Sequence, residues 1–223
     1  MSEYYVAEKF LSINGEGLRA GQPAVFIRFR GCNLKCSYCD TAWAQGNDCP
    51  AEIMTENEIL EYILSAGVKC CTLTGGEPVL REGFDKLCKL LSEQKELRTE
   101  IETNGSADLS QIAALRGENI VFTMDYKLPS SGMEQHMNTD NFKYLTRRDC
   151  VKFVCGSRED LDRAYDIITE HKLSEKCDTI FSPVFGRIEP ADIVDFILEK
   201  KLMTARMQLQ LHKFIWDPNK RGV

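Results

Sequence analysis

Short apolar stretches alternate with amphipathic stretches along the whole chain. Runs of apolar residues with few polar insertions predict strands at residues 24–30, 69–74, 98–103, 119–126, 150–155, 179–184 and 206–212. Apolar residues that recur every three or four positions predict helices at residues 55–67, 84–97, 108–115, 157–175 and 189–203. Strands and helices are therefore expected to follow one another along most of the chain.

Two of these helices also carry start signals. Thr55 can cap the first helix, because Glu58 follows three positions later, and Gly67 can end it. Ser157 can open a later helix in the same way, with Asp160 three positions on. The capping residues thus agree with the apolar spacing about where helices begin.

Alternating strands and helices predict βαβ units with right-handed crossovers and a mostly parallel sheet. About six such units fall short of the eight that close a barrel. We therefore expect an α/β fold, an open and partial TIM-like (β/α)6 barrel, formed by residues 1–223 as a single domain.

Polar and glycine-rich segments follow the predicted strands. They read GCNLKCSYCD (31–40), TGGEP (74–78), ETNG (102–105), MDYKLPSSG (124–132), SPVFG (182–186) and HK (212–213). Parallel sheets carry their functional loops at the carboxyl ends of the strands, so these segments should meet at one edge.

Composition excludes several classes of protein. No apolar run approaches the roughly 18–20 residues of a membrane helix. A net charge of −6 argues against nucleic acid as a partner. The first ten residues, MSEYYVAEKF, lack the basic and apolar regions of a secretion signal, so we expect a cytoplasmic protein with reduced thiols.

The ten cysteines fall into distinct groups. Six lie in or beside apolar patterns and are expected to be small buried residues, namely Cys70, Cys71, Cys88, Cys150, Cys155 and Cys177. Cys49, in a polar loop, receives no assignment. Cys32, Cys36 and Cys39 share one loop with the spacing Cys-x3-Cys-x2-Cys.

Three thiolates on one loop have alternative explanations. Structural zinc needs four ligands, so a zinc site would have to borrow a distant cysteine or histidine. An iron–sulfur cluster held by three thiolates leaves one iron open to a ligand from outside the protein. The spacing favours an iron–sulfur cluster. The alternatives are a zinc site and a chance grouping of cysteines without a metal.

The cysteine loop, with Tyr38 before its last cysteine, resembles the signature of radical S-adenosylmethionine enzymes. A second mark of that superfamily, Gly-Gly-Glu-Pro, follows the next strand as Gly75 to Pro78. The resemblance implies a 4Fe–4S cluster whose open iron binds S-adenosylmethionine, the source of a 5′-deoxyadenosyl radical. Without the resemblance, the Gly-Gly-Glu-Pro segment would be interpreted as an ordinary turn.

Further segments narrow the resemblance to the 7-carboxy-7-deazaguanine synthases, from about Tyr5 to the last residue. They are residues 13–17 (INGEG), 21–23, 26–28, 31–34, 39–41, 102–105, 127–132, 182–184, 210–213 and 221–223. Asn14 stands where that family commonly has glutamine. The resemblance implies conversion of 6-carboxy-5,6,7,8-tetrahydropterin to 7-carboxy-7-deazaguanine in 7-deazapurine and queuosine biosynthesis, with loss of ammonia.

The same resemblance implies partners and ligands. It implies Mg2+ with a hydroxyl ligand from Thr41, a flavodoxin or ferredoxin as one-electron donor, and a homodimer. It places Gly75, Gly76, Glu77, Glu102, Asn104, Asp125, Tyr126, Lys127, Ser182, Pro183 and Val184 at S-adenosylmethionine. It places Ile13, Asn14, Gly15, Glu16, Arg28, Thr74, His212 and Val223 at the pterin. No catalytic residue is expected beyond the cofactor-derived radical.

Residue chemistry bears on some of these roles. The guanidinium of Arg28 matches a carboxylate, and the carboxylate of Glu16 can accept from N–H groups, although each could equally be a solvated surface group. His212 ends a predicted strand, whereas His136 and His171 are expected to be ordinary surface residues. Asp125 and Tyr126 stand where the family often has Ser-Pro.

Two other functions remain open at this point. A glycyl-radical activating enzyme would share the cysteine loop but would need an open groove for a protein substrate and no Glu16–Arg28 pair. A metal-binding interaction module without catalysis would hold zinc or a cluster alone.

Overall fold

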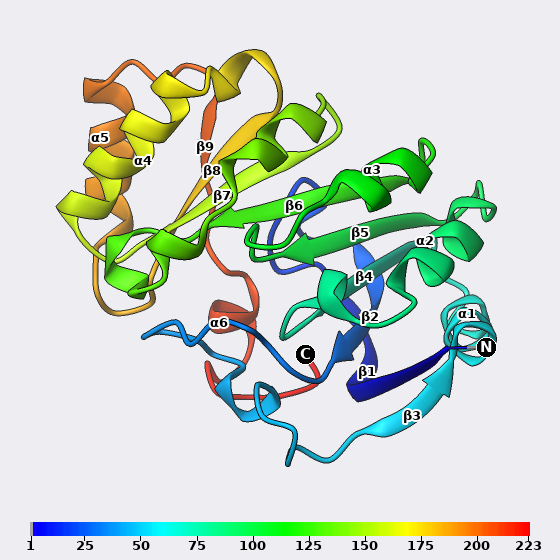
Figure 1. Ribbon diagram of the computed structural model, residues 1–223. Coiled ribbons are helices and arrows are strands. Elements are labelled where there is room, and N and C mark those ends of the chain that lie inside the picture. The colour runs from blue at the N-terminus through cyan, green and yellow to red at the C-terminus, as the bar shows by residue number, and fades with distance from the viewer. Residues whose placement is uncertain (1) are drawn as a thin grey trace.

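A computed structural model describes residues 2–223. Its centre is one nine-stranded sheet in the order β3-β1-β2-β4-β5-β6-β7-β8-β9 (Figure 1). The strands are β1 (Glu3–Ile13), β2 (Pro23–Phe29), β3 (Glu52–Thr55), β4 (Cys70–Gly75), β5 (Arg98–Thr103), β6 (Ile120–Tyr126), β7 (Cys150–Cys155), β8 (Asp178–Pro183) and β9 (Ala205–Met207).

The sheet is mostly parallel and open. Strands β2 and β4 to β9 form one parallel series, whereas β1 pairs antiparallel with both β2 and β3. Strands β3 and β9 form the two edges and do not pair with each other. The predicted open α/β architecture with a mostly parallel sheet is confirmed.

Helices cover the outer face of the curved sheet (Figure 1). They are α1 (Glu56–Ser65), α2 (Phe84–Ser92), α3 (Ser110–Leu115), α4 (Arg158–Glu170), α5 (Pro190–Glu199) and the short α6 (His212–Ile215). Helix α6 and the C-terminus lie on the inner side, below the loops that follow the strands (Figure 1). The capping box predicted at Thr55 and the cap predicted at Ser157 are both present.

The sequence pattern missed β1 and β3. In β1, Tyr4 and Val6 are buried, but the second half of the strand is half-buried on both faces, so its apolar residues do not alternate cleanly. Strand β3 is a short edge strand with only Met54 buried. Strands β1 and β3 add two antiparallel strands to the sheet, beside β2.

Several predicted boundaries were wrong. The helix expected to reach residue 97 ends at Ser92, because Asn119 Nδ2 donates to the carbonyls of Leu91, Gln94 and Leu97 and holds the chain in turns there. The last strand, expected at 206–212, is the edge strand Ala205–Met207. His212 therefore begins α6 and does not end a strand.

The other two long helices also end before the predicted residue. Helix α4 ends at Glu170, and Lys172 then adopts a left-handed conformation with φ of 51°. Helix α5 ends at Glu199, two residues before Lys201, which has φ of 53°. A left-handed residue cannot continue a right-handed helix, so each lysine turns the chain away.

The core lies between the sheet and its outer helices. Phe29 of β2 meets Phe84 of α2 edge-on, with ring centroids 6.0 Å apart.

Five of the six cysteines expected in apolar surroundings are buried, and Cys70 is half-buried. Cys49 is buried as well, and its thiol donates to the Pro50 carbonyl at 3.2 Å. Within residues 2–223, no helix is long and apolar enough to cross a bilayer.

One buried ion pair ties β6 to β7. Asp149 Oδ1 accepts from Arg116 Nη1 at 2.7 Å and from the backbone N–H of Phe122 at 2.8 Å. Asp149 Oδ2 accepts from the backbone and hydroxyl of Thr146. The carboxylate is fully buried and the guanidinium almost so, hence both depend on each other for solvation.

Replacing Asp149 by alanine should destabilise the protein strongly, because it leaves the Arg116 charge buried without a partner. The expected loss is about 3–5 kcal/mol in the free energy of unfolding. That corresponds to a fall of about 6–20 °C in the melting temperature of a chain of this size, measurable by circular dichroism. The matched control is Glu96→Ala, which breaks the exposed Lys69–Glu96 pair and should shift the melting temperature by no more than about 2 °C. Equal shifts for the two variants would contradict the role of the buried pair.

Glu100 of β5 is a second buried carboxyl group, outside the Asp149 pair. Its side chain accepts a hydrogen bond from Thr123, while Oε2 has no partner in the described residues. Burial, with the neighbouring Glu102, raises the pKa of Glu100 from 4.5 to about 7. The folded protein therefore retains a proton that the unfolded chain loses first, so stability falls as the pH rises through this window.

Replacing Glu100 by glutamine should remove this part of the pH dependence, because glutamine still accepts from Thr123 but does not ionise. We expect the variant to gain roughly 2–3 kcal/mol on the wild type between pH 5 and pH 8. Melting temperatures at pH 5, 6, 7 and 8 measure the difference, with the exposed Glu96→Gln as control. Parallel curves for wild type and Glu100→Gln would show that Glu100 does not titrate in this range.

Candidate functional site

A cavity of about 690 Å³ opens on the inner side of the sheet, at the carboxyl ends of its parallel strands. Every polar segment that follows a predicted strand contributes to its wall, as the parallel sheet predicts: Cys32 to Thr41, Thr74 to Gly76, Glu102 to Asn104, Asp125 and Lys127, Val184 and Phe185, and His212 and Lys213. The antiparallel strand β1 and the C-terminal residues 218–223 close other sides. This cavity is the candidate active site.

The cysteine loop is anchored by hydrogen bonds on both sides. Gly31 donates its N–H to the Ala44 carbonyl at 2.8 Å. Ser37 donates through its backbone to the Ser131 carbonyl and through its hydroxyl to the Ser130 carbonyl, and the hydroxyl of Tyr38 donates to the Val154 carbonyl. The three thiols of the loop all line the cavity.

The surroundings of the thiols fit an iron–sulfur cluster. The sulfur of Cys32 accepts from the backbone N–H of Leu34 at 3.4 Å and from Asn104 Nδ2 at 3.7 Å. Such N–H donors to sulfur are typical of cluster thiolates. Burial raises the pKa of the Cys32 and Cys36 thiols, and the positive charge of bound iron would favour the thiolates instead.

The zinc alternative receives no support from the side-chain positions. Across residues 2–223, no three His, Cys, Asp or Glu side chains converge on one position that could hold a metal ion. A structural zinc ion needs four such ligands around one point, whereas the irons of a cluster are bound by separate thiolates.

Two glycines bring the next loop against the cysteine loop. Gly75 has φ of 127°, and a Cβ added to it would lie 2.2 Å from the carbonyl oxygen of Phe29. A Cβ on Gly76 would lie 1.8 Å from the carbonyl oxygen of Gly31. The glycines are therefore required by the approach of two backbones, and both also line the cavity.

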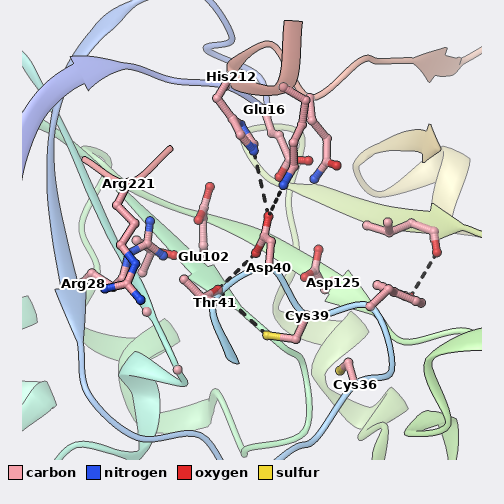
Figure 2. A pocket seen from close by; sticks show the side chains of 18 of the residues that line it. Glu16, Arg28, Cys36, Cys39, Asp40, Thr41, Glu102, Asp125, His212 and Arg221 are labelled. Atoms are coloured by element: carbon pink, nitrogen blue, oxygen red, sulfur yellow. Dashed lines mark hydrogen bonds and ion pairs between the residues drawn. The ribbon is translucent and has the colours of Figure 1, made fainter. Parts of the chain in front are cut away.

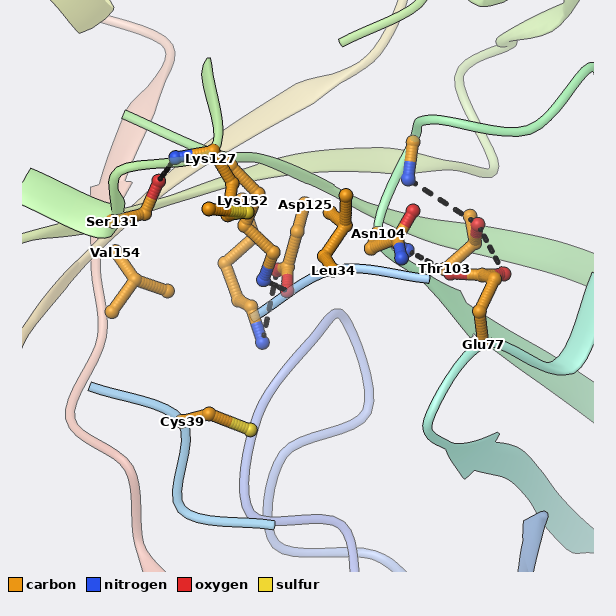
Figure 3. A network of polar contacts seen from close by, with 12 residues as sticks. Leu34, Cys39, Glu77, Thr103, Asn104, Asp125, Lys127, Ser131, Lys152 and Val154 are labelled. Carbon is orange, nitrogen blue, oxygen red and sulfur yellow. Dashed lines mark hydrogen bonds and ion pairs between the residues drawn. The ribbon is translucent and has the colours of Figure 1, made fainter. Parts of the chain in front are cut away.

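Glu77 stabilises the contact between the glycine loop and the cysteine loop and also binds the loop after β5 (Figure 3). Its backbone N–H donates to the Gly31 carbonyl at 2.9 Å. Its fully buried carboxylate accepts from the backbone of Asn104 at 2.6 Å and from the hydroxyl of Thr103 at 2.8 Å. Burial raises the pKa of Glu77 to about 7 despite these bonds. The side chain thus joins two cavity loops and does not itself line the cavity.

A cluster of opposite charges forms one wall of the cavity (Figures 2 and 3). Lys127 Nζ lies 2.5 Å from Asp125 Oδ2, and Lys152 Nζ lies 3.3 Å from Asp125 Oδ1 and also pairs with Glu16. Burial alone would raise the pKa of Asp125, but the two lysines lower it. Burial raises the pKa of nearby Glu102. The wall therefore holds Asp125 as a carboxylate between two ammonium groups.

Arg28 lies elsewhere on the cavity, next to the C-terminal residues (Figure 2). Glu8 Oε2 accepts from Arg28 Nε at 3.1 Å, a bond that does not involve the terminal Nη groups. The guanidinium of Arg221 lies 3.9 Å from the ring centroid of Trp43, so the last residues fold back over the cysteine loop. Val223 lines the cavity as well.

Asp40 and Thr41 face the segment that follows β9. Thr41 Oγ1 donates to Asp40 Oδ1 at 3.1 Å, and Lys213 Nζ lies 3.4 Å from Asp40 Oδ2 (Figure 2). His212 Nε2 lies 3.9 Å from the same oxygen. Desolvation opposes ionisation of Asp40, but His212 and Lys213 outweigh it and hold its pKa well below the usual range.

Five of the residues assigned by resemblance do not line the cavity. Asn14 accepts from Thr72 at 2.7 Å and so faces the sheet, and Glu77 faces the β5 end. Tyr126 points to the other face of β6, where its hydroxyl donates to Glu134 at 3.0 Å. Ser182 and Pro183 are buried at the end of β8. All the other assigned residues are brought together around the cavity.

Sequence reasoning missed other residues of the cavity wall. Lys152 lines it from within β7, where the sequence CVKFVC was assigned only as a strand. Lysine is rarely buried without a partner, so a lysine in such an apolar run was a usable signal. Glu8 and Trp43 also line the cavity, but the first belongs to the unrecognised β1 and the second carried no pattern.

Comparisons with known proteins show the family of this chain. Residues 26–197 match the radical SAM superfamily. A 7-carboxy-7-deazaguanine synthase of Clostridium acetobutylicum is 56% identical over 220 residues, covering 99% of both chains. A synthase of the same name from Chlorobaculum tepidum is 37% identical and covers 98% of this chain and 96% of its own.

Solved structures show the same fold. The crystal structure of QueE from Escherichia coli superposes with a TM-score of 0.72 at 21% identity and covers 93% of both chains. Streptococcus suis SuiB bound to S-adenosylmethionine gives a TM-score of 0.58 at 16% identity, over 80% of this chain and 48% of its own. Taken with the sequence relatives, these matches place the chain in the radical SAM superfamily and, within it, in the family of 7-carboxy-7-deazaguanine synthases.

Proposed function

We propose that this chain converts 6-carboxy-5,6,7,8-tetrahydropterin to 7-carboxy-7-deazaguanine, with loss of ammonia. The observation that carries the proposal is the placement of the three cysteine thiols, Glu16 and Arg28 on one cavity. When bound, the cluster and S-adenosylmethionine supply the radical that takes a hydrogen from C6 of the pterin. The protein contributes binding, orientation and the exclusion of water.

The cluster and S-adenosylmethionine would be held at the ends of β2, β4, β5 and β6. Cys32, Cys36 and Cys39 would bind the irons. Backbone at Thr74 to Gly76 and the side chains of Glu102, Asn104, Asp125, Lys127 and Val184 face the space beside them. Glu77, Tyr126, Ser182 and Pro183 would act through the strand ends they stabilise. Carboxylate and carbonyl oxygens suit the ammonium of the cofactor, and Lys127 suits its carboxylate.

The pterin would span the cavity between opposite chemical groups. Arg28 would bind its carboxylate, since a guanidinium and a carboxylate match in shape and charge. The carboxylate of Glu16 would accept from the N–H donors of the aminopyrimidinone edge. Ile13, Gly15, Thr74 and His212 would complete the pocket, and Asn14 would contribute by fixing the loop that bears Glu16.

Magnesium would bind next to the substrate carboxylate. Thr41 offers a hydroxyl oxygen on the cavity wall, and Mg2+ prefers oxygen ligands and retains several waters. The Val223 carboxylate would contact the pterin, since Val223 and Arg28 both line the cavity. A flavodoxin or ferredoxin as electron donor, a homodimer and a cytoplasmic location complete the proposal on the basis of the family resemblance.

Anaerobic reconstitution tests the function and separates the roles of two residues. Reconstituted protein incubated with S-adenosylmethionine, reductant, Mg2+ and the pterin should form 7-carboxy-7-deazaguanine, detected by mass spectrometry. Cys36→Ala should lose the cluster absorbance and turnover together. Thr41→Ala should keep the cluster and lose roughly 10- to 100-fold in turnover, because one Mg2+ ligand is removed.

Other outcomes would point to the alternative functions. About one zinc per chain and no iron–sulfur absorbance would favour a non-catalytic metal-binding module. Cleavage of S-adenosylmethionine without the deazaguanine product would keep the superfamily and reject the pterin. Glycyl-radical formation on a protein partner would then become the leading hypothesis.

Extending the chain beyond Val223 tests the proposed role of its carboxylate. A hexahistidine tag joined to the C-terminus by a short Gly-Ser linker should raise the KM for the pterin at least about tenfold, because the carboxylate moves away from the cavity. The same tag at the N-terminus is the control and should leave KM unchanged. Full activity of the C-terminally extended enzyme would exclude a role for the terminal carboxylate.

A further inference from the structure

Lys152 is a deeply buried charged side chain of the cavity wall. It projects from the middle of β7 and is only 6% exposed, although its neighbours Val151 and Phe153 are fully buried core residues. An ammonium group in such surroundings needs anionic partners close by. The assignments made from the sequence give this residue no role.

Carboxylates from three separate segments surround the Lys152 ammonium. Glu16 from the loop after β1 pairs with it directly, and Asp125 from β6 lies 3.3 Å away. Asp125 and Glu16, together with Glu102 from β5, raise the pKa of Lys152 well above its usual value, although burial opposes this. Asp125 also pairs with Lys127, whereas Glu16 has Lys152 as its ion-pair partner.

The two carboxylate oxygens of Glu16 have different surroundings. Oε2 contacts Lys152 Nζ, whereas Oε1 is buried and has no hydrogen-bond partner within residues 2–223. A buried carboxylate oxygen without a donor is costly, which indicates that a donor from a ligand belongs there. Because Glu16 lines the cavity, Oε1 is the oxygen that such a ligand would meet.

The backbone of the same loop is fixed independently. Gln208 accepts from the Gly17 N–H at 2.8 Å and donates to the Gly17 carbonyl at 3.0 Å. Leu211 donates its N–H to the Gly15 carbonyl at 3.0 Å. These bonds hold the backbone of Glu16 but leave its side chain free to rotate, so the direction of the carboxylate depends on Lys152.

We propose that Lys152 is a positioning residue, which holds Oε2 of Glu16 so that Oε1 is presented to the N–H donors of the substrate edge. The proposal rests on the proposed function for the identity of that substrate. Without Lys152, the side chain of Glu16 would lose its ion-pair partner and would rotate away from this position.

Substrate binding without turnover tests the proposal. Cluster-loaded protein with S-adenosylmethionine and Mg2+, but no reductant, is titrated with 6-carboxy-5,6,7,8-tetrahydropterin by anaerobic calorimetry. Lys152→Met, which removes the ammonium group but keeps an unbranched side chain, should raise Kd for the pterin by about 10- to 100-fold. Cluster absorbance and Kd for S-adenosylmethionine should change by less than about twofold. Lys152→Arg should recover part of the affinity, and the exposed Lys69→Met is the control.

A double-mutant cycle in melting temperature tests the pairing without any pterin. Glu16→Gln, Lys152→Met and the double variant are compared at pH 8 as cluster-loaded proteins. The double variant should lose less than the sum of the single losses, by about 3 °C or more, because either single change already removes the Lys152–Glu16 ion pair.

The outcomes separate this inference from the proposed function. Unchanged pterin affinity in Lys152→Met, or loss of cluster, S-adenosylmethionine and pterin binding together, would overturn the positioning role. An additive cycle would overturn the pairing itself. A wild type that binds S-adenosylmethionine but not the pterin would reject the proposed substrate, while a coupled cycle would still support the Lys152–Glu16 pairing.

Discussion

The cavity depends on the close approach of two backbones, at the ends of the neighbouring parallel strands β2 and β4. Gly76 donates its N–H to the Phe29 carbonyl at 3.0 Å, and Glu77 donates to Gly31 at 2.9 Å, immediately before Cys32. A side chain on Gly76 would overlap the Gly31 carbonyl. The position of the cysteine loop therefore follows from the absence of two Cβ atoms. The carboxylate of Glu77 then extends the same junction to Asn104 after β5, whose side chain donates to the Cys32 sulfur. One chain of contacts thus connects three strand ends to the first thiol.

Burial of charge is the second constraint, and the protein meets it differently in different places. Away from the cavity, Asp149 has its two oxygens occupied by four donors, so the Arg116 pair serves stability alone. At the cavity wall, Glu16 and Asp125 share lysines but keep oxygen atoms without hydrogen-bond partners in the described part of the chain. Leaving buried acceptors unsatisfied costs stability in the free protein and leaves them available to a ligand. Glu16 Oε1 belongs to a residue that lines the cavity, whereas the unpartnered Oε2 of Glu100 belongs to a residue outside the cavity wall, so only the first is placed to meet a ligand.

The sequence predicted the architecture well where burial is regular. Residues 69–74 and 150–155 are apolar enough to identify inner strands, and Thr55 and Ser157 identify helix starts from local chemistry alone. Prediction failed where tertiary contacts decide the outcome. The side chain of Asn119, more than twenty residues away, ends α2, and half-buried β1 alternates poorly because its second half borders a cavity. For the site, motifs identified residues in loops such as Glu16 and Thr41. They could not identify Lys152, which is 136 positions from Glu16 and whose role exists only through that contact.

The distribution of charge around the cavity gives the site a direction. Arg28 and Arg221 lie next to each other on one side of the cavity, whereas Glu16 and Asp125 lie away from them (Figure 2). A ligand with a carboxylate at one end and N–H donors at the other can satisfy both sides in only one orientation. Reversal would turn its carboxylate away from Arg28 and would leave Oε1 of Glu16 without a donor. A site that leads to radical chemistry must bring one carbon next to the radical source and keep the others away. In this protein, the opposed charges of the walls can supply that selection before any bond is broken.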